Sequence, residues 1–249
     1  MNRIIYKEQL STDVFLMRLE APLIAAERQA GQFVILQLDS SFSERIPLTI
    51  ASADKGEGSI TIIYQTVGNT TRRLSRLEPG QFVENLLGPL GTPTHIAKFG
   101  HVVCVGGGIG VAPLHPIIEA LKAAGNRLTI ICGARNESLL ILQDRMRALA
   151  DELIVVTDDG SAGRKGLVTE PLKELCAGPN KPDLVIAIGP PVMMKFCAET
   201  TRPFHTRMTK LIIRSTLLRV HKGFIGFLNF FEFDISAFFL INIRMKFLG

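Results

Sequence analysis

A glycine-rich segment in the middle of the chain has the residue types best suited to binding a ligand. It reads Gly106-Gly107-Gly108-Ile109-Gly110 and directly follows the continuous apolar run Val102–Val105. Apolar residues spaced as on one face of a helix follow it, at Leu114, Ile117, Ile118 and Leu121. The local order is therefore strand, glycine turn, helix.

We predict that this turn binds the phosphates of a nucleotide. Glycines let the backbone approach a diphosphate closely, and the N-terminus of the next helix supplies free N–H groups and the positive end of the helix dipole. The residues predicted to cradle the phosphates are Gly106, Gly107, Gly108, Gly110, Ala112 and Pro113. The alternative is a tight turn of an α/β sheet that binds nothing.

The residues after the next strand qualify this prediction. A dinucleotide-binding Rossmann unit places Asp or Glu at the end of its second strand, to hold the ribose 2′-hydroxyl. Here the strand expected at Leu128–Cys132 continues as Gly133-Ala134-Arg135, with no acid, so the standard fingerprint is absent. Arg135 and Arg164-Lys165 either bind a 2′-phosphate or are solvated loop charges.

A second group of candidates lies in the first third of the chain. Arg45, Thr49 and the turn Gly68-Asn69-Thr70-Thr71 could together hold a phosphate and one polar edge of a ring. The alternative is an ordinary bend followed by a helix through Leu74 and Leu77, with Thr70 or Thr71 as its N-cap.

The elements that must position these groups fall into two kinds. Residues 1–99 contain short apolar runs about ten residues apart, separated by glycine and proline turns, which favours a small antiparallel barrel or sandwich. The expected strands are Ile4–Tyr6, Val14–Leu19, Phe33–Leu38, Leu48–Ala51, Ile60–Tyr64 and Phe82–Leu87.

Residues 100–204 instead alternate strands with helices, which favours a parallel sheet covered on both faces. After Leu128–Cys132, strands are expected at Leu153–Thr157 and Leu184–Ile188, with a helix carrying Leu139, Leu142, Met146 and Leu149. We therefore expect a β-barrel domain followed by an α/β parallel-sheet nucleotide-binding domain.

Composition excludes several classes of protein. The chain has 249 residues, of which 47% are apolar and 20% charged, as in a globular protein with a substantial core. Seven basic and two acidic residues in 205–249 account for the whole net charge of +5, so residues 1–204 are neutral and give no footprint for nucleic acid. The N-terminus has no apolar signal segment, so we expect a cytoplasmic protein.

Metal chemistry is not expected in this chain. The four cysteines, Cys104, Cys132, Cys176 and Cys197, are too far apart in sequence for a metal-binding pair or an iron–sulfur motif. The five histidines form no H-x-x-x-H pair. We therefore predict no metal site.

Residues 205–249 form an atypical, basic, phenylalanine-rich tail. The stretch Phe224–Ile243 is apolar, but Asn229, Glu232 and Asp234 lie within it, and a central carboxylate costs roughly 3 kcal/mol in a membrane-spanning helix. Membrane insertion is therefore not expected. Because the composition changes abruptly, we expect this end to be out of frame or rearranged.

Taken together, these segments resemble the ferredoxin–NADP+ reductase superfamily. More specifically, the chain resembles the small subunit of NADH-dependent reduced ferredoxin:NADP+ oxidoreductase (sulfide dehydrogenase) and the electron-transfer subunit of dihydroorotate dehydrogenase. The matching segments, in family order, are Arg45–Ile50, Tyr64–Thr71, Leu87–Gly91, Val103–Pro116, Cys132–Ile141, Thr157–Thr169 and Ile188–Phe204. The resemblance implies FAD in the barrel and NAD(H), rather than NADP(H), in the second domain.

The resemblance also implies roles for individual residues. Thr49 would meet the flavin N5 edge, with Pro47 and Leu48 along the ring; Tyr64 would flank the flavin or fill the core. The FAD pyrophosphate would contact Gly68, Thr70 and Thr71, with Arg45 nearby. The segments implied to border the nicotinamide are Asp158, Asp159 and Gly160, and Gly189, Pro190, Pro191 and Met193. Met194 is expected to be helix core.

The chain departs from the family pattern in two places. In the pattern Arg-x-aromatic-Ser/Thr, Ile46 takes the arginine position and Leu48 the aromatic one, with Arg45 one residue away. In addition, these small subunits continue into a segment whose four cysteines hold a [2Fe–2S] cluster, and this chain has no cysteine after Cys197.

The expected function is therefore an NAD(P)H- and FAD-dependent oxidoreductase that passes electrons to a partner subunit, impaired by the loss of the cluster segment. The implied partner is a larger, glutamate synthase-like flavoprotein with iron–sulfur clusters, or the dihydroorotate dehydrogenase catalytic subunit. Two alternatives remain open: a dihydroorotate dehydrogenase electron-transfer subunit in pyrimidine biosynthesis, and a truncated flavin-binding remnant without activity. Cytochrome b5 reductase-like activity is a further enzymatic alternative.

Overall fold

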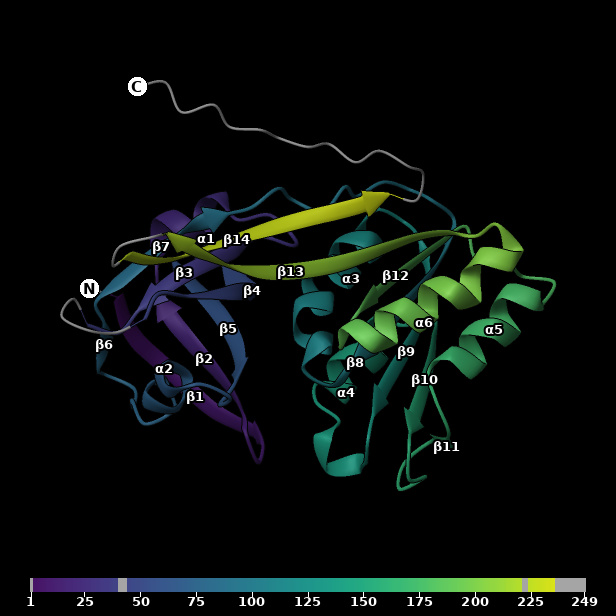
Figure 1. The fold of residues 1–249 in the computed structure, drawn as a ribbon, viewed down its shortest axis with the longest axis horizontal. Coiled ribbons are helices and arrows are strands. Elements are labelled where there is room, and N and C mark those ends of the chain that lie inside the picture. The colour runs from purple at the N-terminus through teal and green to yellow at the C-terminus, as the bar shows by residue number, and fades with distance from the viewer. Residues whose placement is uncertain (1, 40–43, 221–223, 236–249) are drawn as a thin grey trace.

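Two sheets of different kinds lie side by side in the structure (Figure 1). The computed structural model describes residues 2–39, 44–220 and 224–235, and side chains as far as residue 209. An antiparallel, barrel-like sheet is followed along the chain by a mainly parallel sheet with helices on both faces. The fold class expected from the sequence is therefore confirmed.

The barrel contains five of the six strands expected in the first region, and the sixth is divided in two. The order of the barrel strands is β6-β1-β2-β5-β4-β3-β7. The strands are β1 (Asn2–Ser11), β2 (Val14–Glu20), β3 (Phe33–Gln37), β4 (Ile46–Asp54), β5 (Ser59–Gln65), β6 (Phe82–Val83) and β7 (Asn85–Leu90). The expected strand Phe82–Leu87 is in fact two strands, because Phe82–Val83 pairs with β1 and Asn85–Leu90 pairs with β3.

Alternation along the barrel strands separates an inner from an outer face. Ile60, Ile62 and Tyr64 of β5 pack inside the barrel, while Ile63 belongs to a different apolar cluster outside it. Two short helices join the strands, α1 (Pro22–Glu27) and α2 (Asn69–Leu74). Leu74 of α2 is fully buried in the barrel core.

The second sheet has the order β11-β10-β9-β8-β12-β13-β14. Its parallel strands are β8 (His101–Gly107), β9 (Arg127–Ala134), β10 (Glu152–Thr157), β11 (Arg164–Lys165) and β12 (Leu184–Ile188). The connecting helices are α3 (Val111–Ala123), α4 (Gln143–Leu149), α5 (Thr169–Ala177) and α6 (Pro191–Thr201), with 3-10 turns η1 (Gly108–Gly110), η2 (Glu137–Leu139) and η3 (Arg202–Phe204).

The two faces of this sheet pack against different partners. Cys104 and Ile130 face α3, in a cluster that also contains Ala51 and Ile63 of the barrel. Val103 and Ile131 face the other way, toward α5 and α6. Because one cluster contains side chains from both sheets, the barrel and the nucleotide-binding sheet share a continuous core.

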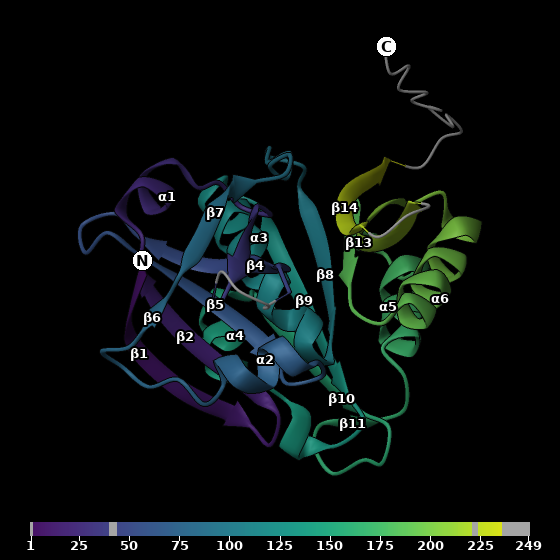
Figure 2. The same cartoon turned by 60° about the vertical axis from the view of Figure 1, so that its left-hand side comes forward.

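The C-terminal segment adds a ribbon to the sheet. β13 (Arg207–Val220) pairs in parallel with β12 only over Arg207–Lys210, and then pairs along its length with β14 (Phe224–Ile235). The sheet thus continues past the boundary expected at residue 204. The ribbon crosses in front of the barrel in Figure 1 but stands apart from it in Figure 2. Part of the tail expected to be out of frame, 221–223 and 236–249, lies outside the described residues.

Two further local expectations differ from the structure. The helix expected from Leu139 to Leu149 is divided into η2 and α4, because Leu142 adopts a left-handed conformation with φ 56°. The N-cap residue of α2 is Gly68, not Thr70 or Thr71. The Thr71 hydroxyl, in the first turn of the helix, instead accepts a hydrogen bond from the Gly68 backbone N–H. Thr169–Ala177, to which no element was assigned from the sequence, forms α5. Among the described residues, no helix has both the length and the apolar character needed to cross a membrane.

Candidate functional site

The glycine-rich turn lies where β8 ends and α3 begins. Gly108 adopts φ +53°, and a β-carbon there would meet no atom within 4 Å, so the backbone is open to a ligand on that side. Gly110, by contrast, lies directly against the carbonyl group of Ile188 on β12, where no side chain would fit. The turn is thus closed on one side by protein and open on the other.

This turn occupies the topological switch point of the parallel sheet. β8 pairs with β9 on one side and with β12 on the other, and the chain leaves β8 in the first direction and returns in the second. Open α/β sheets bind ligands outside the carboxyl ends of strands at such a point. The helix that starts there, α3, has 13 residues and aims its N-terminus at the same place.

The structure brings the segment after β12 to the same turn. A β-carbon on Gly189 would lie 3.2 Å from the Cα atom of Gly107, and the Met193 side chain covers both glycines. Pro190 and Pro191 lead from Gly189 into α6. Met194 is buried, at 5% exposed, so its expected role as helix core is confirmed.

Asp158, Asp159 and Gly160 lie elsewhere along the edge. They follow β10, which is separated from β8 by β9 and from β12 by β9 and β8. At about 4.8 Å per strand, the ends of β10 and β12, from which the two segments leave the sheet, are about 14 Å apart. The structure therefore does not bring together the two segments that the family resemblance placed at the nicotinamide.

The Asp158 loop instead adjoins the end of β9. The backbone N–H of Asp158 donates to the carbonyl of Ala134 at 3.1 Å, and that of Asp159 to the carbonyl of Arg135 at 3.2 Å. Hydrogen bonds from the Ser161 hydroxyl and backbone N–H hold the pKa of Asp159 below its usual range. Asp158 itself is exposed.

In the barrel, β4 presents its candidate residues on two faces. Ile46, Leu48 and Ile50 pack on the barrel core, whereas Ala51 belongs to the cluster shared with α3. By strand alternation Thr49 and Pro47 share the outer face with Ala51, so Leu48 points away from Thr49. The half-buried Thr49 hydroxyl forms no hydrogen bond with another described residue.

The remaining barrel candidates occupy three separate environments. Gly68 and Thr71 are bonded to each other, with the Gly68 N–H donating to the Thr71 hydroxyl at 3.0 Å, and Thr70 is buried beside them. Tyr64 is 2% exposed inside the barrel core and stacks on Phe15, so it fills the core. Arg45 donates to the Gln37 side chain at 3.4 Å, just ahead of β4.

The outer face of β4 and β5 meets the glycine turn. η1 lies against β5, and Ile109 of the turn packs in the same cluster as Ile63. Ile50 pairs with Ile62, so in the antiparallel register Thr49 and Ile63 lie at the same level. Thr49 and the glycine turn are therefore on the same side of the barrel.

Two buried polar residues were not anticipated from the sequence. His115 of α3 is buried and contacts the Ala51 carbonyl of β4, while Asn126, also buried, ties the loop before β8 to the end of α3. The polar type of His115, between the apolar Leu114 and Pro116, was the available signal, whereas Asn126 stands between Gly125 and Arg127. The Ala51 carbonyl is 64 residues from His115 and the Gly100 N–H is 26 residues from Asn126, so these contacts could not be read locally.

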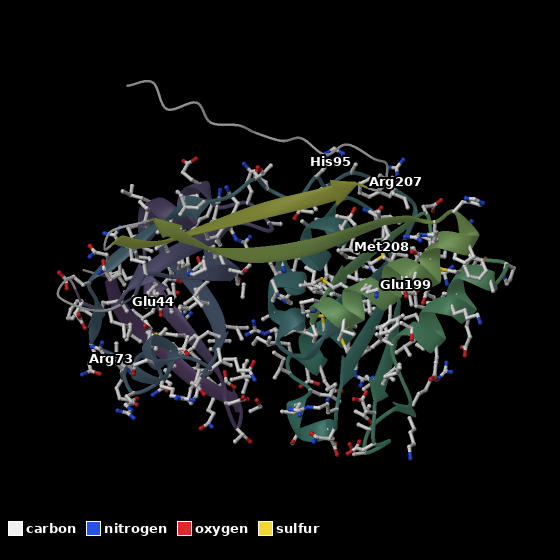
Figure 3. All side chains as sticks on the ribbon, viewed as in Figure 1. Glu44, Arg73, His95, Glu199, Arg207 and Met208 are labelled. Carbon is white, nitrogen blue, oxygen red and sulfur yellow. The ribbon has the colours of Figure 1, made fainter. Side chains whose placement is uncertain are left out.

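A cavity lies outside the predicted site. It has a volume of about 560 Å³ at the amino-terminal ends of β8, β12 and β13, and none of the predicted site residues lines it. Arg207 and Met208, labelled in Figure 3, mark this end of the sheet, on the opposite side of the molecule from Arg73. In the part of the chain that the structure describes, no three His, Cys, Asp or Glu side chains converge as they would around a metal ion.

Comparison with known proteins agrees with this architecture. Residues 104–199 match the family of oxidoreductase NAD-binding domains. A dihydroorotate dehydrogenase B (NAD(+)) electron transfer subunit homolog from Thermotoga maritima is 42% identical over 204 residues, covering 82% of this chain and 71% of the relative. The corresponding subunit from Lysinibacillus sphaericus is 34% identical over 198 residues, covering 78% and 75%.

Solved structures show the same fold. The NADH-dependent reduced ferredoxin-NADP oxidoreductase superposes with a TM-score of 0.81 at 38% identity, covering 88% of this chain and 78% of that one. A ferredoxin NADP+ reductase from Neisseria gonorrhoeae, solved with bound FAD and NADP, has a TM-score of 0.66 at 16% identity, covering 89% and 93%, and shows likeness of fold alone.

The barrel, the parallel sheet and the glycine turn at its switch point define an NAD-binding oxidoreductase with a ferredoxin reductase-like fold. The resemblance seen in the sequence is thereby confirmed. Within that class, the chain belongs to the family of dihydroorotate dehydrogenase B (NAD(+)) electron transfer subunits and their homologues.

Proposed function

We propose that this chain takes electrons from a reduced nicotinamide dinucleotide onto FAD and delivers them to a larger partner subunit. The observation that carries the proposal is the contact of the glycine turn η1 with β5, beside the outer face of β4 that holds Thr49. Ligands held at these two places would meet at the junction of the two sheets.

The dinucleotide would lie along the carboxyl edge of the parallel sheet. Its phosphates would rest on the open side of Gly108, at the N-terminus of α3. The nicotinamide half would extend toward Gly189, Pro190 and Met193 after β12. The adenosine half would extend across β9 toward Arg135 and the Asp158 loop, which revises the role that the family resemblance implied for Asp158, Asp159 and Gly160.

The barrel residues fit a flavin on the outer face of β4. The Thr49 hydroxyl has no partner among the described residues, and the nearest atom to a β-carbon on Gly68 would be the Thr71 hydroxyl oxygen, at 3.9 Å, which leaves that turn open. Thr49 and Pro47 would contact the ring, with Gly68, Thr70, Thr71 and Arg45 toward its phosphates. Bound FAD supplies the acceptor for a hydride from the nicotinamide, and the protein contributes positioning rather than a general base.

We propose NADH over NADPH as the electron donor. The adenosine half would approach Asp158 and Asp159, and a 2′-phosphate there would meet carboxylates as well as Arg135. The names of the relatives, which specify NAD(+), support the same choice. The repulsion between one carboxylate and the 2′-phosphate of NADPH is worth about 1 kcal/mol in water. Removing it in Asp158→Asn should therefore raise the rate with NADPH, relative to the rate with NADH, about fivefold. Asp144→Asn, on an exposed residue of α4, should leave the ratio unchanged.

The partner is proposed to be a larger flavoprotein subunit with iron–sulfur clusters, or alternatively a dihydroorotate dehydrogenase catalytic subunit. The relatives' description as electron transfer subunits supports a protein partner. All four cysteines of this chain are buried in the apolar clusters of the parallel sheet. Because they are therefore not placed to hold a [2Fe–2S] cluster, their burial supports the proposal that the delivery of electrons through such a cluster is impaired. Co-purification of the native complex would identify the partner.

Two glycines provide a sharp test of the dinucleotide site. Gly108 and Gly125 lie at opposite ends of α3, with φ +53° and +78°, and a β-carbon on either would meet nothing within 4 Å. Alanine at either position therefore carries a similar backbone strain of about 1 kcal/mol. Only Gly108 is in the proposed phosphate site.

We expect FAD-loaded protein, mixed anaerobically with NADH, to lose its flavin absorbance on the order of seconds or faster. Gly108→Ala should weaken NADH binding at least about tenfold, because the methyl group occupies the phosphate's position, while Gly125→Ala should not. No bleaching of the native protein would favour the inactive-remnant alternative. Equal effects of the two substitutions would refute the phosphate site.

A further inference from the structure

A buried imidazole at the junction of the two sheets has no role in the function proposed above. His115 lies in the second turn of α3 and is 4% exposed. The surrounding apolar cluster combines Ala51 and Ile63 of the barrel with Leu114 and Ile118 of α3. The imidazole therefore lies where the barrel and the nucleotide-binding sheet are in direct contact.

His115 reaches across this contact to β4. Its Nδ1 lies 3.4 Å from the carbonyl oxygen of Ala51. Since a carbonyl oxygen can only accept a hydrogen bond, the interaction requires the proton on Nδ1. The other ring nitrogen, Nε2, lies 3.7 Å from a carboxylate oxygen of Glu119, one turn further along α3.

The surroundings keep this imidazole neutral. Burial lowers the pKa of His115 below its usual value of 6.5. Glu119 and the Ala51 carbonyl act in the opposite direction, while Arg145 of α4 and Arg28, which follows α1, reinforce the effect of burial. A neutral ring has a single N–H, and the carbonyl of Ala51 determines which nitrogen carries it.

The contact lies close to both halves of the proposed site. Ala51 follows Thr49 by two residues, about 7 Å along an extended strand. His115 follows Gly110 by five residues, about 7.5 Å along the helix axis. Ala51 lies at an irregularity of β4, between Ile50 and Ser52, two residues from Thr49, and His115 lies on the helix that begins at the glycine turn. A change in this one contact would therefore alter the separation of Thr49 and the glycine turn.

We infer that His115 is a positioning residue, which donates its Nδ1–H to the Ala51 carbonyl and thereby sets the distance between the strand that carries Thr49 and the turn that carries Gly108. This inference rests on the proposed function, since it places a flavin on β4 and a dinucleotide at the turn. A misplacement of reacting groups by about 1 Å costs up to about 100-fold in rate.

Two substitutions at His115 separate positioning from simple packing. In His115→Leu the donor is lost, and flavin reduction at saturating NADH should slow at least about tenfold. The dissociation constants of FAD and NAD+, measured separately, should stay within about threefold, because neither ligand contacts the imidazole. His115→Asn retains an N–H near the position of Nδ1 and should recover most of the rate.

His101→Leu is the matched control. The His101 ring also joins separate segments, with Nδ1 3.0 Å from the Asn180 carbonyl and Nε2 2.9 Å from the Thr129 hydroxyl, but at the amino-terminal end of the sheet. This substitution should lower the thermal midpoint without changing the rate of flavin reduction. An equal loss of rate in His101→Leu and His115→Leu would reduce the role of His115 to fold stability and overturn the inference.

A measurement without cofactors tests the same contact. In 15N-histidine NMR spectra of the native chain, His115 should be the Nδ1–H tautomer at pH 7, and in His115→Leu hydrogen exchange should accelerate in β4 and the first half of α3. The Nε2–H tautomer, or unchanged exchange, would overturn the inference.

The outcomes distinguish the inference from the function on which it rests. If native protein is not reduced by NADH, the proposed function fails, while the tautomer and the exchange data still report on the contact. If native protein is reduced and His115→Leu reacts within twofold of it, the function stands and the inference fails. A loss of rate matched by a loss of FAD or NAD+ affinity would also overturn it.

Discussion

The side chain of Met193 occupies the space that a β-carbon on Gly107 would fill. Met193 lies in the first turn of α6, after β12, and Gly107 ends β8 immediately before the turn. The same methionine covers Gly189, where a β-carbon would lie 2.6 Å from its methyl carbon. The start of α6 is thus packed directly onto the glycine turn, and the two loops at the switch point form one unit.

This packing predicts strong coupling between the two residues. Gly107→Ala should lower the free energy of unfolding by about 1–3 kcal/mol, because the methyl group overlaps Met193. Adding Met193→Ala should recover part of this loss, with a coupling of at least about 0.5 kcal/mol in a double-mutant cycle followed by urea unfolding. Strictly additive effects would show that the two residues do not touch.

Asn126 should be a major contributor to stability. Its side-chain oxygen accepts from the backbone N–H groups of Phe99 and Gly100 at 2.7 and 3.1 Å, and its amide donates to the carbonyls of Ala97 and Leu121 at 2.9 and 2.8 Å. Asn126→Ala should cost about 2–4 kcal/mol in urea unfolding, since these buried groups lose their partner.

A control for this loss is Asn136→Ala, because the Asn136 side chain accepts one hydrogen bond, from the exposed Ser138. This change should cost less than about 1 kcal/mol. Similar losses at the two positions would contradict the assigned role of Asn126.

The buried His115 predicts a pH dependence of stability. Its pKa is lower in the folded protein than in the unfolded chain, mainly because burial disfavours the charged ring. Between the two pKa values the unfolded chain binds more protons, so stability is retained above about pH 6.5 and lost as the pH falls below it. Urea unfolding between pH 7 and 5 should show a shallower slope for His115→Leu than for native protein. Parallel slopes would place His115 in a solvent-like environment.

The cysteines should be unreactive in the folded protein. Burial raises the pKa of Cys104, Cys132 and Cys197 to about 12, and also raises that of Cys176. Because the thiolate is the reacting form, a disulfide reagent should label the native chain at least about 100-fold more slowly than the chain in denaturant, where all four thiols react. Rapid labelling of any cysteine in the native protein would contradict this burial.

Local pattern was sufficient for the strand, turn and helix at the glycine-rich segment. The apolar run before Gly106 and the helical spacing after it depend only on neighbouring residues, and both β8 and α3 form as expected. The split of Phe82–Leu87 into two strands could not be foreseen, because each half is defined by a different distant partner, β1 or β3.

The division of the expected second helix has a similar origin. Leu142 adopts φ 56°, a conformation that leucine disfavours and that neither its apolar type nor its spacing indicates. Gly68 is the N-cap residue of α2 for a related reason, because its backbone N–H donates a hydrogen bond to the Thr71 hydroxyl. The position of a helix end depends on the backbone conformation of several consecutive residues, and more than one of them can supply the hydrogen bond that caps it.

The sequence by itself determined the two kinds of sheet, the glycine turn and the family, since periodicity and glycine placement act over short distances. Only the tertiary structure decided that Asp158 lies three strands from Gly189, that Leu48 points away from Thr49, and that His115 meets Ala51. Strand order and the facing of side chains across an interface arise from long-range packing, in which residues far apart in the chain compete for the same neighbours. The spacing of residue types along the sequence therefore does not predict which of these long-range contacts form.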